Sequence, residues 1–191
     1  MTPIEQLTGK EFEALVKQRC DQLRLAKLAS IGRYGVQAAR RKDDWVIMQS
    51  LPDFEGCSRD GRQTIFDCKV CSAASFDLSQ YRRETNGAKA RQLSHMLERS
   101  QYSVRCFFLI HWNSRSLKTR SEDAETWAFP VKHGHPFWTA FESGEIKSIN
   151  RKDCESYGEF VSWTLLNPAD RKHRPDVLTA IRFDSMALLE V

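Results

Sequence analysis

The sequence lacks the features that mark membrane, secreted and repeat proteins. No apolar run approaches the roughly 20 residues that a membrane-spanning helix needs. The first residues contain no basic region followed by an apolar segment, so they do not indicate a secretion signal. Internal repeats and low-complexity tracts are also absent from the chain. These absences favour a cytoplasmic protein that does not act in a membrane.

A complete cysteine–histidine metal motif is missing as well. The six cysteines include one close pair, Cys68 and Cys71, with the spacing of a zinc knuckle. That pair falls on a predicted strand, where residues three apart face opposite sides, and no second pair with suitable spacing follows. His133 and His135 are likewise two histidines without further ligands. We interpret the cysteines as reduced, mostly buried thiols and leave the role of Cys68 and Cys71 open.

Charge is unevenly distributed along a chain whose net charge is only +4. Between Lys17 and Lys42, eight Lys or Arg residues accompany one acidic residue, Asp21. Clustered cations suit polyanions such as nucleic acid, although a solvated basic face explains the same pattern. At 191 residues the chain is long enough for one domain with a proper core. We expect this domain over residues 1–166, followed by a basic tail, 167–191, of unclear structure.

The periodicity of apolar residues predicts an α/β fold. Thr8 and Glu11 form a capping-box pattern, and the apolar stripe after them predicts a helix over residues 9–27. The near-continuous apolar run at 104–112 is typical of a central strand covered on both faces. Residues 29–42 fit either a strand interrupted by a bend or a flexible arm. Further helices are predicted near 88–100, 137–141 and 153–157, and further strands at 45–48, 126–131 and 148–149. Loops are predicted at 72–87 and 113–124. The segment 177–191 has no clear period.

Residues 51–70 predict a hairpin of two strands around a tight turn at 59–61. On the second strand, Asp67 and Lys69 share one face, while Phe66, Cys68 and Val70 point the other way into a core. The hairpin brings Asp53 to the same end. Two carboxylates and a lysine are therefore expected to converge at one edge of a mixed sheet flanked by helices.

This combination suits the hydrolysis of a phosphodiester. Two carboxylates and the backbone carbonyl of Cys68 are enough to hold Mg²⁺, which keeps several waters, and Mn²⁺ is an alternative. Lys69 beside the metal would orient the attacking water or neutralise charge on the phosphate. Each residue also has a structural explanation. In that alternative, Asp67 and Lys69 are only a salt pair on an exposed strand, and Asp53 only starts a turn. Glu13 and Gln92 are then surface residues of their helices.

Asp53, thirteen intervening residues and then Asp67-x-Lys69 follow the motif of the PD-(D/E)xK nuclease superfamily. Within it the chain resembles the RecU-type Holliday-junction resolvases of bacteria and phages. The matching segments are Gly9-x-x-Phe12-Glu13, Ser50-Leu-Pro-Asp53-Phe-Glu-Gly56, Ile65-Phe-Asp67-Cys-Lys69, Ser75-Phe76-Asp-Leu78, Arg91-Gln92-Leu-Ser-His95-Met96, Cys106–Ile110 and Lys147-Ser-Ile149.

The resemblance implies a restriction-endonuclease-like fold and a Mg²⁺-dependent, homodimeric endonuclease that cuts branched DNA. On this interpretation Asp53 and Asp67 hold the metal, Lys69 positions water or stabilises charge, Glu13 completes the metal environment and Gln92 orients the site. The DNA contacts that we expect come from a basic segment, a helix and a loop: Arg33, Arg40, Arg41, Lys42, Arg91 and Ser75.

The chain also departs from that family. Arg91 stands where the family usually has His, and Asp67 is one methylene shorter than the usual Glu. Only about residues 32–44 are available for the stalk that enters a four-way junction in such resolvases. Two other functions therefore stay open. One is a restriction-like or end- or flap-directed nuclease of a mobile element, and the other is a DNA-binding protein that keeps the fold without catalysis.

Overall fold

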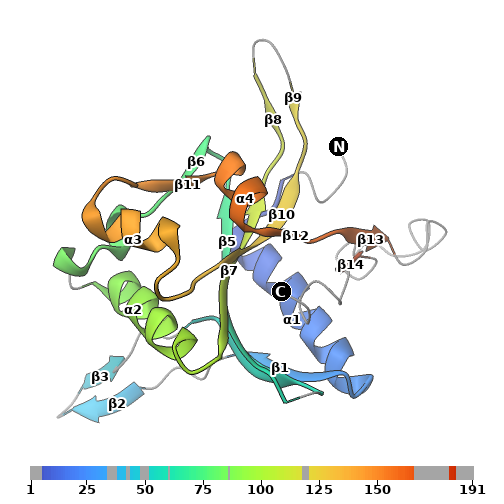
Figure 1. Ribbon diagram of the computed structural model, residues 1–191. Helices are drawn as coiled ribbons and strands as arrows, with labels where there is room; N and C mark the ends of the chain where they lie inside the picture. Colours follow the sequence, from blue (N-terminus) through green and yellow to red (C-terminus); the bar gives the residue numbers. More distant parts are fainter. Residues whose placement is uncertain are drawn as a thin grey trace.

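The main sheet is mixed and is covered by helices on both faces (Figure 1). The computed structural model describes residues 6–33, 38–41, 44–47, 52–59, 61–85, 87–117, 121–165 and 181–183. Within these ranges the helices are α1 (Gly9–Leu25), α2 (Ala88–Ser100), α3 (Pro136–Ser143) and α4 (Arg151–Tyr157), with 3₁₀ turns η1 (Ser79–Tyr81) and η2 (Arg83–Thr85). The main strands are β1 (Ala29–Arg33), β4 (Phe54–Ser58), β5 (Gln63–Cys71), β7 (Arg105–Trp112), β10 (Glu125–Pro130) and β12 (Glu159–Phe160).

The described strands of this sheet follow the order β1-β4-β5-β7-β10-β12. The β5–β7 pair is parallel and the other neighbours are antiparallel. Residues 106–112 of β7 are all buried, as expected for a strand covered on both faces. The predicted α/β class, with a mixed central sheet flanked by helices, is therefore confirmed.

One face of the sheet packs against α1, and the other packs against α2 and α3 (Figure 1). Thr8 and Glu11 form the predicted capping box, which fixes where α1 begins. The helix ends at Leu25, two residues earlier than predicted, and Lys27 just beyond it has a φ of 57°. On the α1 face, Phe66 of β5 stacks between Phe54 and Phe107, with ring centroids 5.0 and 4.9 Å apart.

The β4–β5 hairpin confirms the predicted alternation of faces. Ile65 and Cys71 of β5 belong to the core on the α2 side, whereas Phe66 and Cys68 belong to the core on the α1 side, with Val70 packed against it. The close pair Cys68 and Cys71 is thus divided between the two faces.

A close approach of two strands explains the glycine at position 56. A Cβ atom there would lie 2.1 Å from the carbonyl oxygen of Ser30 on β1. Any larger residue would force β1 and β4 apart, because no real Cβ approaches backbone that closely.

Both predicted loops contain short strands. Within 72–87, β6 (Ser75–Asp77) pairs with β11 (Ser148–Asn150), and the two 3₁₀ turns follow it. Within 113–124, β8 (Arg115–Ser116) pairs with β9 (Ser121–Glu122). The loop predictions were wrong at these places because strands of two or three residues are too short to show a period.

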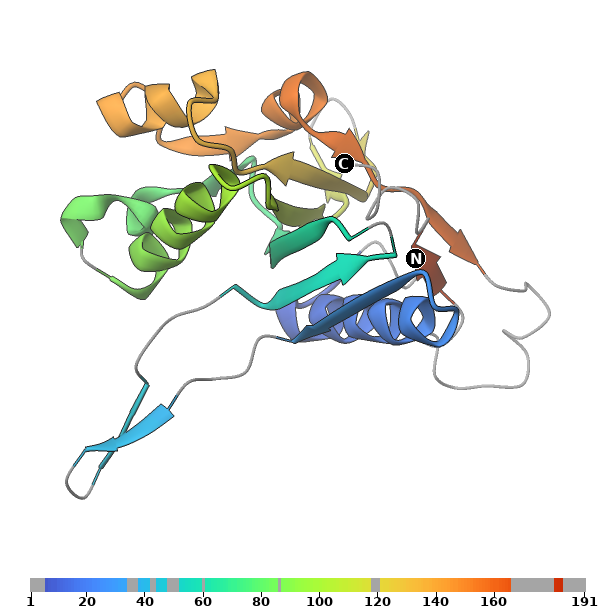
Figure 2. The same cartoon turned by 60° about the horizontal axis from the view of Figure 1, so that its bottom comes forward.

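Residues 29–42 divide between two structures. β1 joins the main sheet beside β4, whereas β2 (Ala38–Arg41) pairs with β3 (Asp44–Ile47) in a separate hairpin. Figure 2 shows this hairpin extending away from the main sheet. Of the unassigned segment 177–191, β14 (Ile181–Phe183) pairs with β13 (Trp163–Leu165). Within the described part of the chain, no helix is long and apolar enough to cross a membrane.

Candidate functional site

The predicted site residues of the hairpin meet where β4 begins. The register pairs Phe54 with Phe66, so the next antiparallel positions place Asp53 beside Asp67 and Pro52 beside Cys68. Cross-strand partners share a face, so the two aspartates lie on the α2 face of the sheet. The sequence predicted a site at an edge of the sheet. It lies inside the sheet instead, because β5 is between β4 and β7.

Pro52 and Asp53 change how β5 is hydrogen-bonded at this point. The N–H of Cys68 donates to Oδ2 of Asp53 at 2.8 Å. The N–H and C=O of one strand residue point to the same neighbouring strand, so the Cys68 carbonyl also faces the space before β4. The residue opposite is Pro52, which has no N–H to donate. Among the described residues, position 52 therefore supplies no backbone donor to this carbonyl oxygen, which lies on the same side of β5 as the Asp53 carboxyl group.

Asp67 is fully buried, which contradicts the alternative of a salt pair on an exposed strand. Its Oδ1 accepts a hydrogen bond from Nε2 of Gln92 at 2.8 Å. Its Oδ2 forms an ion pair with Nζ of Lys69 and accepts no hydrogen bond of normal geometry. The half-buried Asp53 carboxyl group lies within hydrogen-bonding reach of the fully buried Asp67 carboxyl group, so two acidic groups meet at this point.

For both Asp67 and Lys69, burial and the opposite charge of the partner shift the pKa in opposite directions. Burial raises the pKa of Asp67 to about 7, Lys69 opposes that rise, and Asp53 adds to it. Burial by itself would lower the pKa of Lys69, but the Asp67 carboxylate and the Tyr81 hydroxyl raise it above its usual value. The raised pKa favours the ammonium form of Lys69, which can stabilise negative charge.

Gln92 reaches the site from the first half of α2. It is 5% exposed, so the alternative of a surface helix residue is wrong. Its amide fixes the orientation of the Asp67 carboxyl group, in the way that outer partners orient metal ligands.

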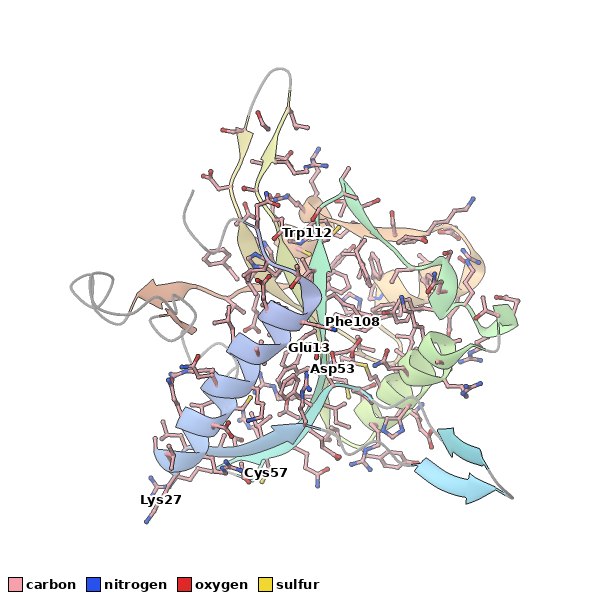
Figure 3. The ribbon with its side chains drawn as sticks, turned by 180° about the vertical axis from the view of Figure 1, so that it is seen from behind. Glu13, Lys27, Asp53, Cys57, Phe108 and Trp112 are labelled. Carbon is pink, nitrogen blue, oxygen red and sulfur yellow. The ribbon has the colours of Figure 1, made fainter. Side chains whose placement is uncertain are left out.

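Glu13 takes a different partner. It lies on α1, where it forms an ion pair with Arg33 of β1, the first of the expected DNA contacts. Figure 3 shows Glu13 and Asp53 from the α1 side of the sheet. Among the described interactions, Glu13 has none with Asp67 or Lys69.

The other expected DNA contacts are spread over the molecule. Arg91 is exposed on α2, and Ser75 is half-buried in β6. Arg40 and Arg41 lie in β2, whose side chains are outside the description, and Lys42 lies outside the described residues.

Sequence reasoning missed Tyr81. Its side chain is buried beside the Lys69 ammonium, on a 3₁₀ turn within the predicted loop 72–87. The available signal was its position three residues after Leu78, the last residue of the Ser75-Phe76-Asp-Leu78 segment.

A divalent cation fits the donors at this site. Each aspartate has one oxygen in a hydrogen bond, Asp53 Oδ2 with Cys68 and Asp67 Oδ1 with Gln92. The donors that a cation would meet are the other oxygen of Asp53 and Oδ2 of Asp67, which is paired with Lys69. Two carboxylates and the Cys68 carbonyl form a hard oxygen set of the kind Mg²⁺ takes while keeping waters. A cluster of three or more His, Cys, Asp or Glu side chains that could hold a metal is absent from the described residues, so a third protein donor would have to come from elsewhere, such as the Cys68 carbonyl.

Comparison with solved structures gives distant structural likenesses. The structure is similar to Hjc, a Holliday junction resolvase from the archaeal hyperthermophile Archaeoglobus fulgidus, with a TM-score of 0.42 and 13% sequence identity. The match covers 78% of this chain and 93% of that chain. The sequence matches no family model and no curated protein.

Proposed function

We propose that this protein is a divalent-metal-dependent endonuclease that hydrolyses phosphodiesters in branched DNA. The observation that carries the proposal is the buried Asp67 carboxyl group. It is held by Gln92, paired with Lys69 and faced by Asp53. Burying one carboxyl group beside a second one is unfavourable for folding, and a bound cation would compensate this cost.

Each residue has a role in this proposal. Asp53, Asp67 and the Cys68 carbonyl hold the metal, and Gln92 keeps Asp67 in the ligating orientation. When bound, a divalent cation acidifies water and polarises the phosphate. Lys69 stabilises the negative charge that develops on the phosphoryl oxygens. Glu13 completes the site only if it leaves Arg33, so its contribution depends on what the DNA does to that ion pair.

Branched DNA is the proposed substrate because of the motifs that surround the site. Ser75-Phe76-x-Leu78 and Gln92 follow the order of RecU-type resolvases. The β2–β3 hairpin, which contains Arg40 and Arg41, extends from the body as a small basic projection (Figure 2). We propose that it contacts the phosphates at the branch and that the enzyme acts as a homodimer, since a four-way junction presents two equivalent strands for cutting.

The decisive experiment measures cleavage of a synthetic four-way junction, a duplex and a single strand of matched sequence, with Mg²⁺ or with chelator. The wild-type protein is compared with Lys69→Ala and Asp67→Asn. Lys152→Ala serves as a matched control, since Lys152 is an exposed lysine on α4. We expect cleavage by the wild type and the control, and loss of cleavage in the two site variants. Equal activity in all four proteins would remove the site assignment.

The substrate comparison separates the remaining possibilities. Faster cutting of the junction supports a resolvase, while a preference for linear ends or flaps identifies an end-directed nuclease. DNA binding that weakens steeply with salt, without cutting under Mg²⁺ or Mn²⁺, identifies a non-catalytic DNA-binding protein.

A further inference from the structure

Tyr81 is a buried residue whose polar atom has no evident structural purpose. The side chain is 1% exposed, and its hydroxyl oxygen is buried without a hydrogen bond of normal geometry. The ring packs edge-on against Phe76 and Phe108, with centroids 5.8 and 5.4 Å away. A phenylalanine would make the same packing contacts and would avoid burying an unsatisfied hydroxyl group, which costs stability.

The hydroxyl group lies beside the ammonium group of Lys69. The two groups interact directly, and the carboxyl groups of Asp67 and Asp53 also act on the Tyr81 hydroxyl group. The Lys89 ammonium group lies over the opposite part of the residue, the ring, at 5.6 Å from its centroid. The backbone N–H of Tyr81 donates to the Leu78 carbonyl at 2.9 Å, which holds the residue in its 3₁₀ turn. Ring packing and backbone bonding therefore fix the position of the oxygen.

Lysine needs such an anchor because it ends a flexible stem. An ammonium group has three N–H donors and no preferred plane, so one carboxylate does not fix its direction. Lys69 forms an ion pair with Asp67 Oδ2, and the Tyr81 oxygen lies beside the same ammonium group, where it can accept a second N–H. The Lys69 side chain is 18% exposed, so the ammonium group is not completely enclosed by these partners.

We propose that Tyr81 is a positioning residue, which holds the Lys69 ammonium so that its remaining N–H is directed at the phosphate being cut. This inference rests on the proposed function, because it assigns the phosphate as the target of that N–H. The anchoring itself is a property of the free protein. This anchoring would matter most if the Asp67 oxygen that pairs with Lys69 bound a metal, because Tyr81 would then be the partner that still fixes Lys69.

The first test is a double-mutant cycle on junction cleavage with Tyr81→Phe, Lys69→Ala and the double variant. Tyr81→Phe should lower kcat by about 10- to 100-fold with KM nearly unchanged, as expected for loss of positioning. In the Lys69→Ala background, Tyr81→Phe should have no further effect on the residual rate. Tyr102→Phe is the matched control, since Tyr102 is 71% exposed. Equal effects of Tyr81→Phe in both backgrounds would assign Tyr81 to packing alone and overturn the proposal.

The second test needs neither DNA nor metal. Nuclear magnetic resonance of ¹⁵N-labelled lysine ammonium groups in the wild type should show slow hydrogen exchange at Lys69 and contacts from the Tyr81 ring to the Lys69 side chain. Exchange at Lys69 should accelerate in Tyr81→Phe and stay unchanged in Tyr102→Phe. Unchanged exchange in Tyr81→Phe, or no ring contact in the wild type, overturns the positioning role. If the wild type cuts no DNA, the proposed nuclease function fails, while these spectra still decide whether Tyr81 anchors Lys69.

Discussion

The buried His111–Thr126 pair and the buried Asp67 lie on opposite faces of the main sheet, and their surroundings distinguish a structural contact from a candidate functional site. On the α1 side, His111 of β7 and Thr126 of β10 are both fully buried, and Nδ1 of His111 lies 2.8 Å from Oγ1 of Thr126. On the α2 side, Asp67 is equally buried but faces a second carboxyl group and a lysine. The members of the first pair are hydrogen-bonded to each other, and the contact contains no carboxyl group and no lysine. The second holds excess charge in a dry site, which is the usual mark of a functional group.

The largest expected effect is the loss of cleavage when either carboxylate is neutralised. Asp53→Asn and Asp67→Asn should each lower kcat/KM for the junction by about 1,000-fold or more, because a metal ligand is removed. Thr126→Val is the control from the other buried pair and should stay within about twofold of the wild type. A large loss of activity in Thr126→Val would break the contrast between the two regions.

The site around Asp67 should also make the stability of the protein depend on pH, which the His111–Thr126 comparison does not predict. The pKa of Asp67 is raised to about 7 in the folded protein from an ordinary value of 3.8. Between about pH 4 and pH 7 the folded protein therefore holds a proton that the unfolded chain has released, so the free energy of unfolding falls as pH rises through this window. Urea unfolding in chelator should show this decline in the wild type and lose it in Asp67→Asn. Added Mg²⁺ should stabilise the wild type more at pH 8 than at pH 5.

Thr126→Val should affect stability rather than chemistry. The substitution leaves a buried ring nitrogen of His111 without the hydroxyl group of Thr126, which costs about 1–3 kcal/mol. Urea unfolding at constant pH measures the change in the free energy of unfolding. An unchanged midpoint would show that this pair contributes nothing to the fold.

Gln92→Ala should have a smaller effect on activity than loss of a carboxylate. Asp67 would keep its charge and lose its anchor, which lowers metal affinity or kcat by about tenfold. Glu98→Ala, an exposed change on the same helix, is the control. Titration of cleavage against Mg²⁺ concentration separates the two causes, and a curve that matches the wild type would remove Gln92 from the site.

The smallest expected effect comes from an exposed cation outside the catalytic set. Arg91→Ala should weaken DNA binding by about three- to tenfold and reduce the slope of affinity against salt by about one. Arg83→Ala, which removes an exposed arginine paired with Glu142, is the control. Fluorescence anisotropy in chelator measures both quantities. An unchanged salt slope would show that Arg91 makes no phosphate contact.

Much of the fold followed from local patterns, but the environment of the site did not. The capping box at Thr8, the helix at 88–100 and the alternation along β5 were all predictable, because each depends on residues a few positions apart. Strands β6, β8 and β9 were not, because such short strands form only when distant partners supply their hydrogen bonds.

The sequence by itself determined that Asp67 and Lys69 share a face and that Asp53 comes to the same end of the hairpin, since both follow from the period of a strand. Only the tertiary structure decided that this face is dry. α2 brings Gln92 onto Asp67, and η1 brings Tyr81 beside Lys69, across 25 and 12 positions of the chain respectively. The pKa of Asp67 changes because desolvation depends on everything packed around a group, and strand periodicity contains no information about what will cover a face.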